Sequence, residues 1–289
     1  MPRSAGVREV RVEGLAKTYG TLPVLADVSL RAAPGDFISI IGPSGCGKST
    51  LFNILAGLAA PDAGQVLVDG APAEGRTFGY MPQKDLLFPW RTILDNAALG
   101  LEVAGMRRRA ARDRARPLFE PFGLAGFERA HPFELSGGMR QRAALLRTVV
   151  QDREVLLLDE PFGALDSLTR TGMQEWLEGV RARFGWTVLL ITHDIREAVF
   201  LSDRVVVLGP RPARVRRVVE IALPRPRTVE MVTCPGFAAA EAELLAALRE
   251  PAVEPGLREP DPREPAQQEP ELREPDGEVH AGPDRSGRP

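Results

Sequence analysis

Residues 37–50, with the sequence FISIIGPSGCGKST, decide the fold of this chain. Five residues of a buried-strand run lead directly into a glycine-rich segment, and residues 42–49 match the pattern G-x-x-x-x-G-K-S in full. Glycines let backbone N–H groups close around phosphate oxygens, and the start of the following helix adds the positive end of its dipole. We therefore predict a phosphate-binding loop between a strand and a helix over 48–57. Eight residues at fixed spacing disfavour a plain glycine turn.

Two further strand ends are predicted to meet this loop. Residues 155–158 read as a strand that ends in Asp159 and Glu160, and residues 187–192 read as a strand that ends before His193. One carboxylate at such a place can hold Mg²⁺ through water, and a second can polarise an attacking water. Because open α/β sheets bind ligands at the carboxyl ends of their strands, we expect these residues and Gly42 at one edge. An ordinary acidic pair and a structural histidine are the alternatives.

The segment Leu135-Ser136-Gly137-Gly138 opens another predicted helix. Ser136 suits the N-cap position of that helix. Two glycines in a first turn cost about 1 kcal/mol each in helix stability, and a simple N-cap needs neither. Glycines here would let an anion approach the backbone closely. The segment therefore predicts a second place where phosphate is bound.

The rest of the chain alternates strands and helices around an insertion. Strands are predicted at 7–13, 65–68, 78–80 and 204–208, and helices at 168–184 and 194–201. Such alternation predicts a mostly parallel sheet. Residues 85–150 read instead as helices with arginine-rich faces, such as 106–116, and form a predicted helical subdomain. Thr92 and Asp95 have the spacing of a loose capping box at a helix start.

The composition changes after about residue 250. Residues 251–289 contain nine Pro, ten acidic and five basic residues, and the triplet Arg-Glu-Pro recurs at 258–260, 263–265 and 273–275. Such a segment cannot bury enough apolar surface to order itself. We expect a solvated tail in preference to a docking motif, with a C-terminal extension at 216–250 before it.

Bulk properties narrow the class of protein. The chain has 289 residues, 44% of them apolar, which is enough for one large core or for one core and a small subdomain. A formal net charge of −2 makes no general case for nucleic-acid binding. Two distant cysteines fit a reduced cytosolic protein. No run approaches the ~20 apolar residues that span a bilayer, so we expect another chain to supply any channel.

These motifs, in this order, resemble the ATP-binding cassette of ABC transporters, over about residues 7–215. The resemblance implies an α/β fold: a P-loop NTPase core with a mostly parallel sheet, an antiparallel β edge and an inserted helical subdomain. It also implies a head-to-tail dimer with two ATP molecules in the interface. One departure is Met139, where the family usually has Gln, and a thioether cannot replace the amide's hydrogen bonds. The residues that face phosphate are unchanged.

The resemblance assigns a role to each candidate residue. It implies that Glu160 is the catalytic base and His193 the switch histidine. Mg²⁺ would be held by Ser49, Gln83 and Asp159, and Tyr19 would stack on adenine. The ATP phosphates would be held by Gly42, Pro43, Ser44, Gly45, Cys46, Gly47, Lys48, Ser49 and Thr50. From the second subunit, the implied contacts with ATP come from Ser136, Gly137, Gly138 and Asp166.

The segment 88–92, with Asp95 and Asn96, is similar to a branch of importers for nitrate, sulfonates, taurine and related solutes, and importers of thiamine pyrimidine precursors are also similar. This implies an ATPase at the cytoplasmic face of the membrane. Its implied partners are permease subunits, a second ATPase subunit in a homodimer and an extracytoplasmic solute-binding protein, with no nucleic acid. The competing interpretations are a soluble ABC ATPase acting on nucleic acid or ribosomes, and a P-loop kinase or GTPase.

Overall fold

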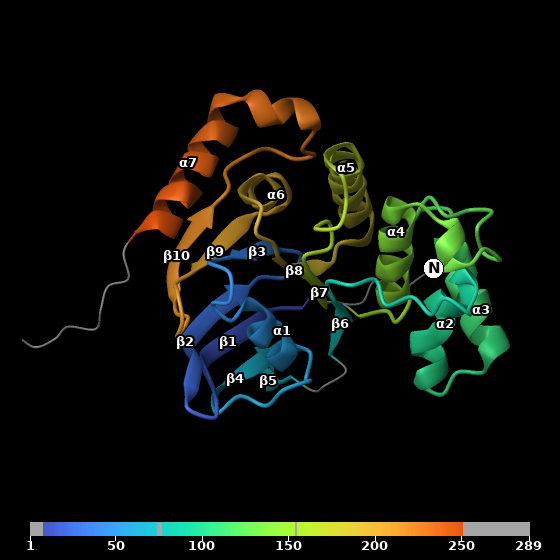
Figure 1. The fold of residues 1–289 in the computed structure, drawn as a ribbon, viewed down its shortest axis with the longest axis horizontal. Coiled ribbons are helices and arrows are strands. Elements are labelled where there is room, and N and C mark those ends of the chain that lie inside the picture. The colour runs from blue at the N-terminus through green and yellow to red at the C-terminus, as the bar shows by residue number, and fades with distance from the viewer. Residues whose placement is uncertain (1–7, 74–76, 154, 251–289) are drawn as a thin grey trace, which may run out of the picture. The chain divides into compact units, whose positions relative to one another are not determined.

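The computed structural model of the chain describes residues 8–73, 77–153 and 155–250. These residues belong to one compact unit, shown in Figure 1. The expected tail at 251–289 and the first residue of the expected strand at 7–13 lie outside the described residues. Within the described part, no helix combines the length and the apolar character needed to cross a membrane.

A six-stranded sheet in the order β10-β9-β3-β8-β7-β6 forms the centre of this unit. Its strands pair in parallel except at the edge, where β10 runs antiparallel to β9. The mostly parallel sheet predicted from the sequence is therefore confirmed. The strands are β3 (Phe37–Ile41), β6 (Phe78–Met81), β7 (Val155–Asp159), β8 (Thr187–Ile191), β9 (Arg204–Leu208) and β10 (Val215–Glu220).

A second, four-stranded sheet is antiparallel and has the order β2-β1-β4-β5. Its strands are β1 (Val10–Tyr19), β2 (Leu22–Ala32), β4 (Ala63–Val68) and β5 (Ala71–Pro72). The long strand β2 was not among the predicted elements. Its second half alternates buried and exposed residues from Val28 to Ala32, a local pattern that indicates a strand.

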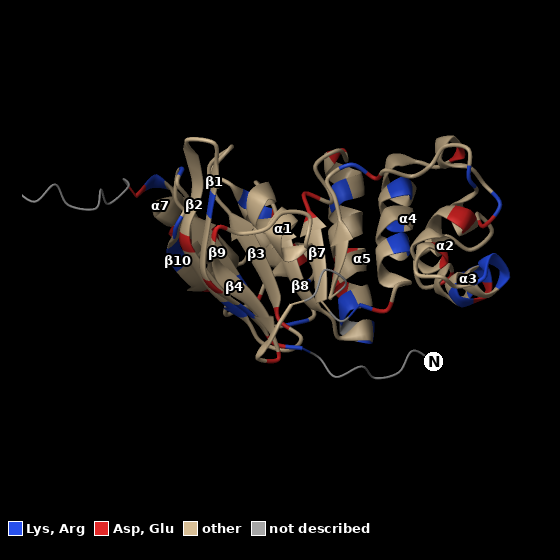
Figure 2. Ribbon diagram, turned by 90° about the horizontal axis from the view of Figure 1, so that it is seen from below, with Lys and Arg blue, Asp and Glu red and all other residues tan. Residues whose placement is uncertain are grey.

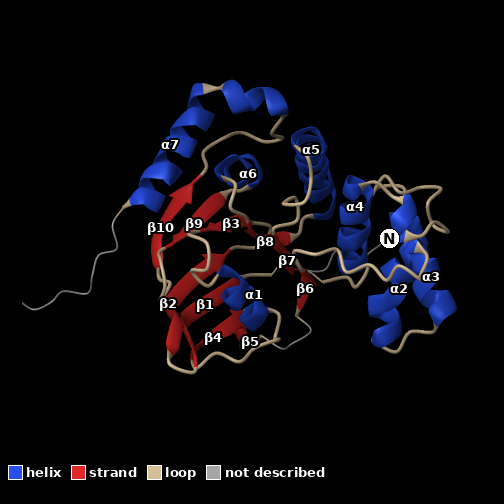
Figure 3. Cartoon of the chain, viewed as in Figure 1, coloured by secondary structure: helices blue, strands red, loops and turns tan. Residues whose placement is uncertain are grey.

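The helices divide between the two faces of the central sheet and the inserted subdomain (Figure 3). On one face lie α5 (Ser167–Phe184), α6 (Ile195–Leu201) and α7 (Pro235–Arg249), and on the other lie α1 (Lys48–Leu55) and the antiparallel sheet. The inserted subdomain contains α2 (Ile93–Val103), α3 (Arg108–Ala115) and α4 (Gly137–Val149). Short 3₁₀ turns occur at Arg116–Leu118, Pro132–Glu134 and Val229–Thr233.

Two apolar cores result from the alternation of side chains along the central strands. In β7, for example, Leu156 and Leu158 face the core under α5 and α6, whereas Val155 and Leu157 face the core under α1. Strands buried on both faces read as continuous apolar runs, because every residue meets a core. This is why the short runs at 155–158 and 187–192 were recognisable in the sequence.

The inserted subdomain is stabilised by charge as well as by apolar packing. Arginine is the commonest charged residue of α3, whose ribbon is largely blue in Figure 2, and the buried positions of this helix are Ala111 and Ala115. Thr92 caps α2 by accepting a hydrogen bond from the Asp95 backbone N–H at 3.2 Å. The Asp95 carboxylate, however, pairs with Arg108 and Arg112 on α3, at 2.9 and 2.6 Å. The capping box is thus only half formed, because the carboxylate joins α2 to α3 instead.

Candidate nucleotide-binding and catalytic site

The predicted site residues follow the carboxyl ends of three neighbouring strands. Gly42 follows β3, Glu160 follows β7 and His193 comes two residues after β8. Because β3, β8 and β7 are adjacent and parallel, their ends open on one edge of the sheet. Contacts between the predicted residues bear this out around one carboxylate. The Gln83 Nε2 donates to Glu160 Oε2 at 2.9 Å, and His193 Nδ1 lies 3.3 Å from the same oxygen.

The loop after β3 has a backbone that requires glycine. Gly45 and Gly47 both have positive φ angles, of 72° and 123°. A Cβ on Gly47 would also lie 2.8 Å from the Leu25 side chain of β2, so no other residue fits there without a shift. The loop therefore packs closely against β2, a strand that was not among the predicted elements.

Lys48 begins α1 and folds back over the loop. Its ammonium group donates to the backbone carbonyls of Gly42 and Pro43, at 2.9 and 3.1 Å. The side chain is buried, with 8% of the residue exposed. The charge is thus held beside the loop backbone and the first turn of α1, where phosphate oxygens would be bound.

Glu160 sits in a strained backbone conformation. Its φ angle is +45°, which is unfavourable for a residue with a Cβ. Residues in such conformations concentrate at functional sites. The conformation is fixed because the Glu160 N–H donates to the Ile191 carbonyl of β8 at 2.9 Å. This bond continues the pairing of β7 with β8 past the last strand residue. It turns the carboxylate toward Gln83 and His193.

Asp159, the preceding carboxylate, is buried beside Tyr80. The Tyr80 hydroxyl on β6 donates to Asp159 Oδ2 at 3.4 Å. Burial, and then the charge of Glu160, raise the pKa of Asp159 to about 6, against the opposing effects of Tyr80 and Lys48. Two adjacent carboxylates in this position favour binding of a cation. Tyr80 was not among the predicted site residues, although its place on a strand three residues before Gln83 could have indicated it.

The donor set predicted for Mg²⁺ has the right chemistry. A hydroxyl from Ser49, an amide from Gln83 and a carboxylate from Asp159 all offer oxygen, which this hard cation prefers. Among the described residues, no group of three His, Cys, Asp or Glu could hold a metal ion by itself. A magnesium ion here would therefore need the hydroxyl, the amide, water and phosphate oxygens as well as one carboxylate.

The segment 135–138 opens α4, as the sequence predicts. Gly138, however, is explained by the packing of two helices. Ser136 is the N-cap and accepts from the Met139 N–H at 3.3 Å. A Cβ on Gly138 would lie 2.8 Å from the Thr169 methyl group of α5, so this glycine is required for close packing of two helices. A Cβ on Gly137 would make only ordinary contacts, the nearest at 3.4 Å. Within the described residues, the contacts found for Ser136 and Gly138 are to α4 and α5, and none is to the loop at 42–50.

The remaining predicted residues lie at element ends. Tyr19 ends β1 and is exposed, with the Lys17 ammonium 5.4 Å from its ring centre. Asp166 is the N-cap of α5 and accepts from the Thr169 N–H at 3.0 Å. Within the loop, Cys46 is buried whereas Pro43 and Ser44 are exposed.

Comparison with known proteins agrees with this arrangement. A family model described as "ABC transporter" matches residues 25–163. The chain is 43% identical over 225 residues to an uncharacterised ABC transporter ATP-binding protein of Methanocaldococcus jannaschii, covering 76% of this chain and 84% of that protein. It is 45% identical to the taurine import ATP-binding protein TauB of Yersinia pestis, covering 71% and 82% respectively. It is 41% identical to the aliphatic sulfonates import ATP-binding protein SsuB of Bacillus cereus, covering 74% and 84%.

Solved structures show the same architecture. A bacterial ABC transporter cassette solved as a dimer is 31% identical, with a TM-score of 0.64, covering 74% of this chain and all of that one. A dimeric post-hydrolysis state of the same cassette, bound to ADP and Pi, is similar at 30% identity and the same TM-score and coverage.

Proposed function

The chain belongs to the family of ABC transporter ATP-binding proteins, and from this premise we propose that it is the ATP-hydrolysing subunit of an importer for a small solute. Members of this family are ATPases, and the α/β fold found here is theirs. The observation that carries the proposal is the geometry of Glu160. Its carboxylate is held between Gln83 and His193, on the edge of the sheet that also carries the phosphate loop.

Each group at this edge has a part in hydrolysis. The N–H groups of residues 42–50 and the Lys48 ammonium bind and orient the phosphates of ATP. Glu160 accepts a proton from the attacking water, and His193 holds that carboxylate in place through their 3.3 Å contact. Ser49, Gln83 and Asp159 would hold Mg²⁺, which neutralises charge on the phosphoryl oxygens when it is bound.

A second copy of the chain completes the site in this proposal. Ser136, Gly137, Gly138 and Asp166 would contact the ATP that is bound by the other subunit. The dimeric state of the related bacterial cassette, which is also known with ADP and Pi, supports this arrangement. The exposure of Ser136 and Asp166 in the single chain is consistent with such a contact.

The names of the relatives support a class of solute. TauB of Yersinia pestis is a taurine import protein, and SsuB of Bacillus cereus is named for import of aliphatic sulfonates. We propose small sulfonates as the transported class, in preference to a thiamine pyrimidine precursor. The system would include permease subunits and an extracytoplasmic solute-binding protein, with this chain bound peripherally at the cytoplasmic face of the membrane.

The proposed contact with the permease lies at residues 86–90. Trp90 is 72% exposed and stacks on Phe88, with ring centres 5.0 Å apart. Buried Asn96 organises this loop, because its side chain accepts from the Phe88 N–H and donates to three carbonyls of residues 88–92. An open cavity of about 630 Å³ lies beside the loop, lined by residues that include Leu86, Phe88 and Val103. Exposed aromatic side chains beside a groove suit a protein partner.

Reconstitution tests the proposal. The chain would be assembled with its permease in proteoliposomes, and ATP-dependent uptake of labelled taurine would be measured with and without the binding protein. We expect the Trp90→Ala variant to keep ATP hydrolysis in the isolated chain and to lose assembly and uptake. Phe127→Ala, an exposed aromatic of the same subdomain, is the matched control and should behave as the wild type.

Three outcomes would contradict separate parts of the proposal. Wild-type uptake by the Trp90→Ala complex would eliminate the permease contact. Loss of about 3–5 kcal/mol of stability in Trp90→Ala would mark a core residue instead. Uptake of a different solute, with no stimulation by taurine or alkanesulfonates, would eliminate the solute class and leave the ATPase intact.

A further inference from the structure

A partly buried polar cluster lies between α5 and α6, and the proposed chemistry does not use it. Its members are Arg170 on the first turn of α5, Asp194 at the start of α6 and Glu197 on the first turn of α6. The cluster adjoins two of the predicted motifs, because Arg170 follows the turn 164–166 and Asp194 follows His193. The cluster therefore lies between the turn at 164–166 and the turn that carries His193.

Arg170 connects the two motifs through its two terminal nitrogens. One nitrogen, Nη2, donates to the Leu165 carbonyl at 2.9 Å. The other, Nη1, lies 3.5 Å from Asp194 Oδ2. A planar guanidinium can hold two acceptors at fixed spacing, which a single ammonium group cannot do. Arg170 therefore links the turn at 164–166 to the residue beside His193.

Asp194 caps the start of α6 and directly follows His193 in the chain. Its Oδ1 accepts from the backbone N–H groups of Arg196 and Glu197, at 2.9 and 3.2 Å. Its own N–H donates to the Thr192 hydroxyl at 3.0 Å. One carboxylate oxygen of Asp194 thus caps the helix and the other faces Arg170, directly after His193 in the chain.

Glu197 adds a buried carboxyl group to the cluster. The residue is 4% exposed, and its Oε1 has no hydrogen-bond partner among the described residues. Burial, and then the charge of Asp194, raise the pKa of Glu197 to about 8, whereas Thr192 and Arg170 act in the opposite direction. The other basic residue of this turn, Arg196, pairs with Glu241 of α7 at 2.9 Å. Arg170 therefore contacts Asp194 and lies close enough to Glu197 for its charge to oppose the rise of the Glu197 pKa.

We propose that Arg170 is a positioning residue for ATP hydrolysis, which acts by holding the turn at 164–166 and the His193 turn in one arrangement. This inference rests on the function proposed above for Glu160 and His193. If Arg170 no longer bridges Leu165 and Asp194, the start of α6 loses one of its supports. His193 then leaves the position in which it contacts Glu160. Errors of about 1 Å in such contacts can cost up to about a hundredfold in rate.

The test compares three variants in the full-length chain. Arg170→Gln removes the charge and the two-point contact, Arg170→Lys keeps the charge alone, and Arg183→Gln changes an exposed arginine of the same helix as the control. We expect kcat to fall about tenfold to a hundredfold in Arg170→Gln, with the KM for ATP changed less than about twofold. Arg170→Lys should fall between that variant and the wild type. Arg183→Gln should match the wild type.

A double-mutant cycle with His193→Ala shows whether Arg170 acts through the histidine. If it does, Arg170→Gln should reduce kcat less than about twofold further once His193 is absent, because the effects of coupled residues are not additive. An unchanged kcat in Arg170→Gln would overturn the inference. A full additional loss in the His193→Ala background, with a lower melting temperature in Arg170→Lys as well, would also overturn it and indicate a purely structural role.

Comparison with the Glu160→Gln and His193→Ala single variants separates this inference from the proposed function. If Glu160→Gln and His193→Ala both hydrolyse ATP at the wild-type rate, the proposed catalytic roles fail, and the inference fails with them. If both variants are impaired and the Arg170 variants are not, the positioning role alone is overturned.

Discussion

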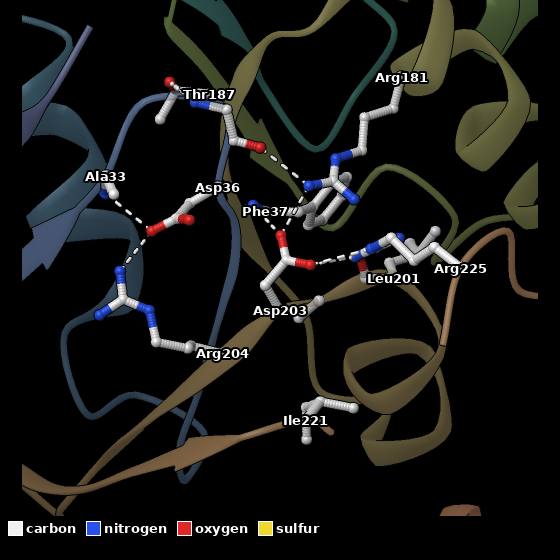
Figure 4. A network of polar contacts seen from close by, with 12 residues as sticks. Ala33, Asp36, Phe37, Arg181, Thr187, Leu201, Asp203, Arg204, Ile221 and Arg225 are labelled. Atoms are coloured by element: carbon white, nitrogen blue, oxygen red, sulfur yellow. Dashed lines mark hydrogen bonds and ion pairs between the residues drawn. The ribbon is translucent and has the colours of Figure 1, made fainter. Parts of the chain in front are cut away.

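The charged groups at the two ends of the central strands differ in how they are paired. At the amino ends of β3, β8 and β9 the charged side chains are paired with one another and with the backbone (Figure 4). At the carboxyl end of β7, Asp159 lies beside the like charge of Glu160, which has a strained backbone. The same sheet therefore pairs its charges at one end and keeps two like charges together at the other.

The amino end is organised around Asp203, the residue before β9. Its carboxylate accepts from the Phe37 N–H at 2.8 Å, from Arg181 at 2.6 Å and from Arg225 at 2.9 Å. Burial opposes ionisation, but these donors outweigh it and lower the pKa of Asp203. Arg225 also pairs with Glu178 of α5, which secures the segment between β10 and α7 to the core.

The carboxyl end differs in the pKa shift of its buried aspartate and in its backbone conformation. The pKa of Asp159 is raised to about 6, the opposite direction to that of Asp203, although both are aspartates at strand ends. Glu160 keeps a positive φ angle. Such features cost stability and persist where the surrounding fold enforces them. Burial raises the pKa of both aspartates, but only Asp203 has donors and opposite charges that outweigh it.

The largest effect should come from Glu160→Gln at the carboxyl end. The amide cannot accept a proton from water, so we expect turnover to fall at least about a hundredfold while ATP still binds. The thermal unfolding midpoint should not fall. Steady-state hydrolysis and equilibrium ATP binding are the measurements, with Glu120→Gln as an exposed control. Hydrolysis near the wild-type rate would remove Glu160 from the mechanism.

At the amino end, Asp203→Ala should show the reverse behaviour. It leaves Arg181, Arg225 and the Phe37 N–H without their shared acceptor, and we expect the free energy of unfolding to fall by about 2–3 kcal/mol. The kcat of the folded fraction should stay within about twofold of the wild type. Urea unfolding and single-turnover hydrolysis measure the two quantities. A matched control is Glu243→Ala on α7, whose exposed pair with Arg217 should be worth less than about 1 kcal/mol. If Asp203→Ala had normal stability and poor turnover, the distinction between the two ends would be contradicted.

Acid titration sharpens the same contrast. Because the folded-state pKa of Asp203 lies below its ordinary value of 3.8, its ionised form stabilises the fold fully above about that pH. That stability is lost as the pH falls through the lowered pKa. The difference in unfolding free energy between the wild type and Asp203→Asn should therefore be constant near neutral pH and shrink below about pH 4. A difference that grows on acidification would contradict the assigned pairing.

The smallest effect should come from Tyr80→Phe. The variant keeps the ring against Phe52 of α1, where the ring centres are 6.5 Å apart, and removes only the hydroxyl that contacts Asp159. Since this contact is long at 3.4 Å, we expect about a two- to fivefold weaker affinity for Mn²⁺ in the ATP complex, measured by electron paramagnetic resonance. Stability should change by less than about 0.5 kcal/mol. Unchanged Mn²⁺ affinity would show that the hydroxyl does not support the metal site.

Local sequence patterns determined much of this fold and its candidate site. The run at 37–41, the loop at 42–49 and the strand before Asp159 need only neighbouring residues to be recognised, because glycine spacing and continuous apolar runs reflect local backbone geometry. The N-cap role of Ser136 was predictable for the same reason. The three strand ends could be placed together because parallel strands in one sheet share their direction.

Tertiary structure alone decided the contacts between distant segments. No local pattern indicates that Gly138 must be glycine because of Thr169, that Arg170 reaches Leu165 and Asp194, or that Tyr80 meets Asp159. The opposite pKa shifts of Asp159 and Asp203 have the same origin. Glu160 is a chain neighbour of Asp159, but burial and the distant groups Tyr80, Arg181 and Arg225 come from the fold, which brings groups far apart in the sequence within a few ångströms.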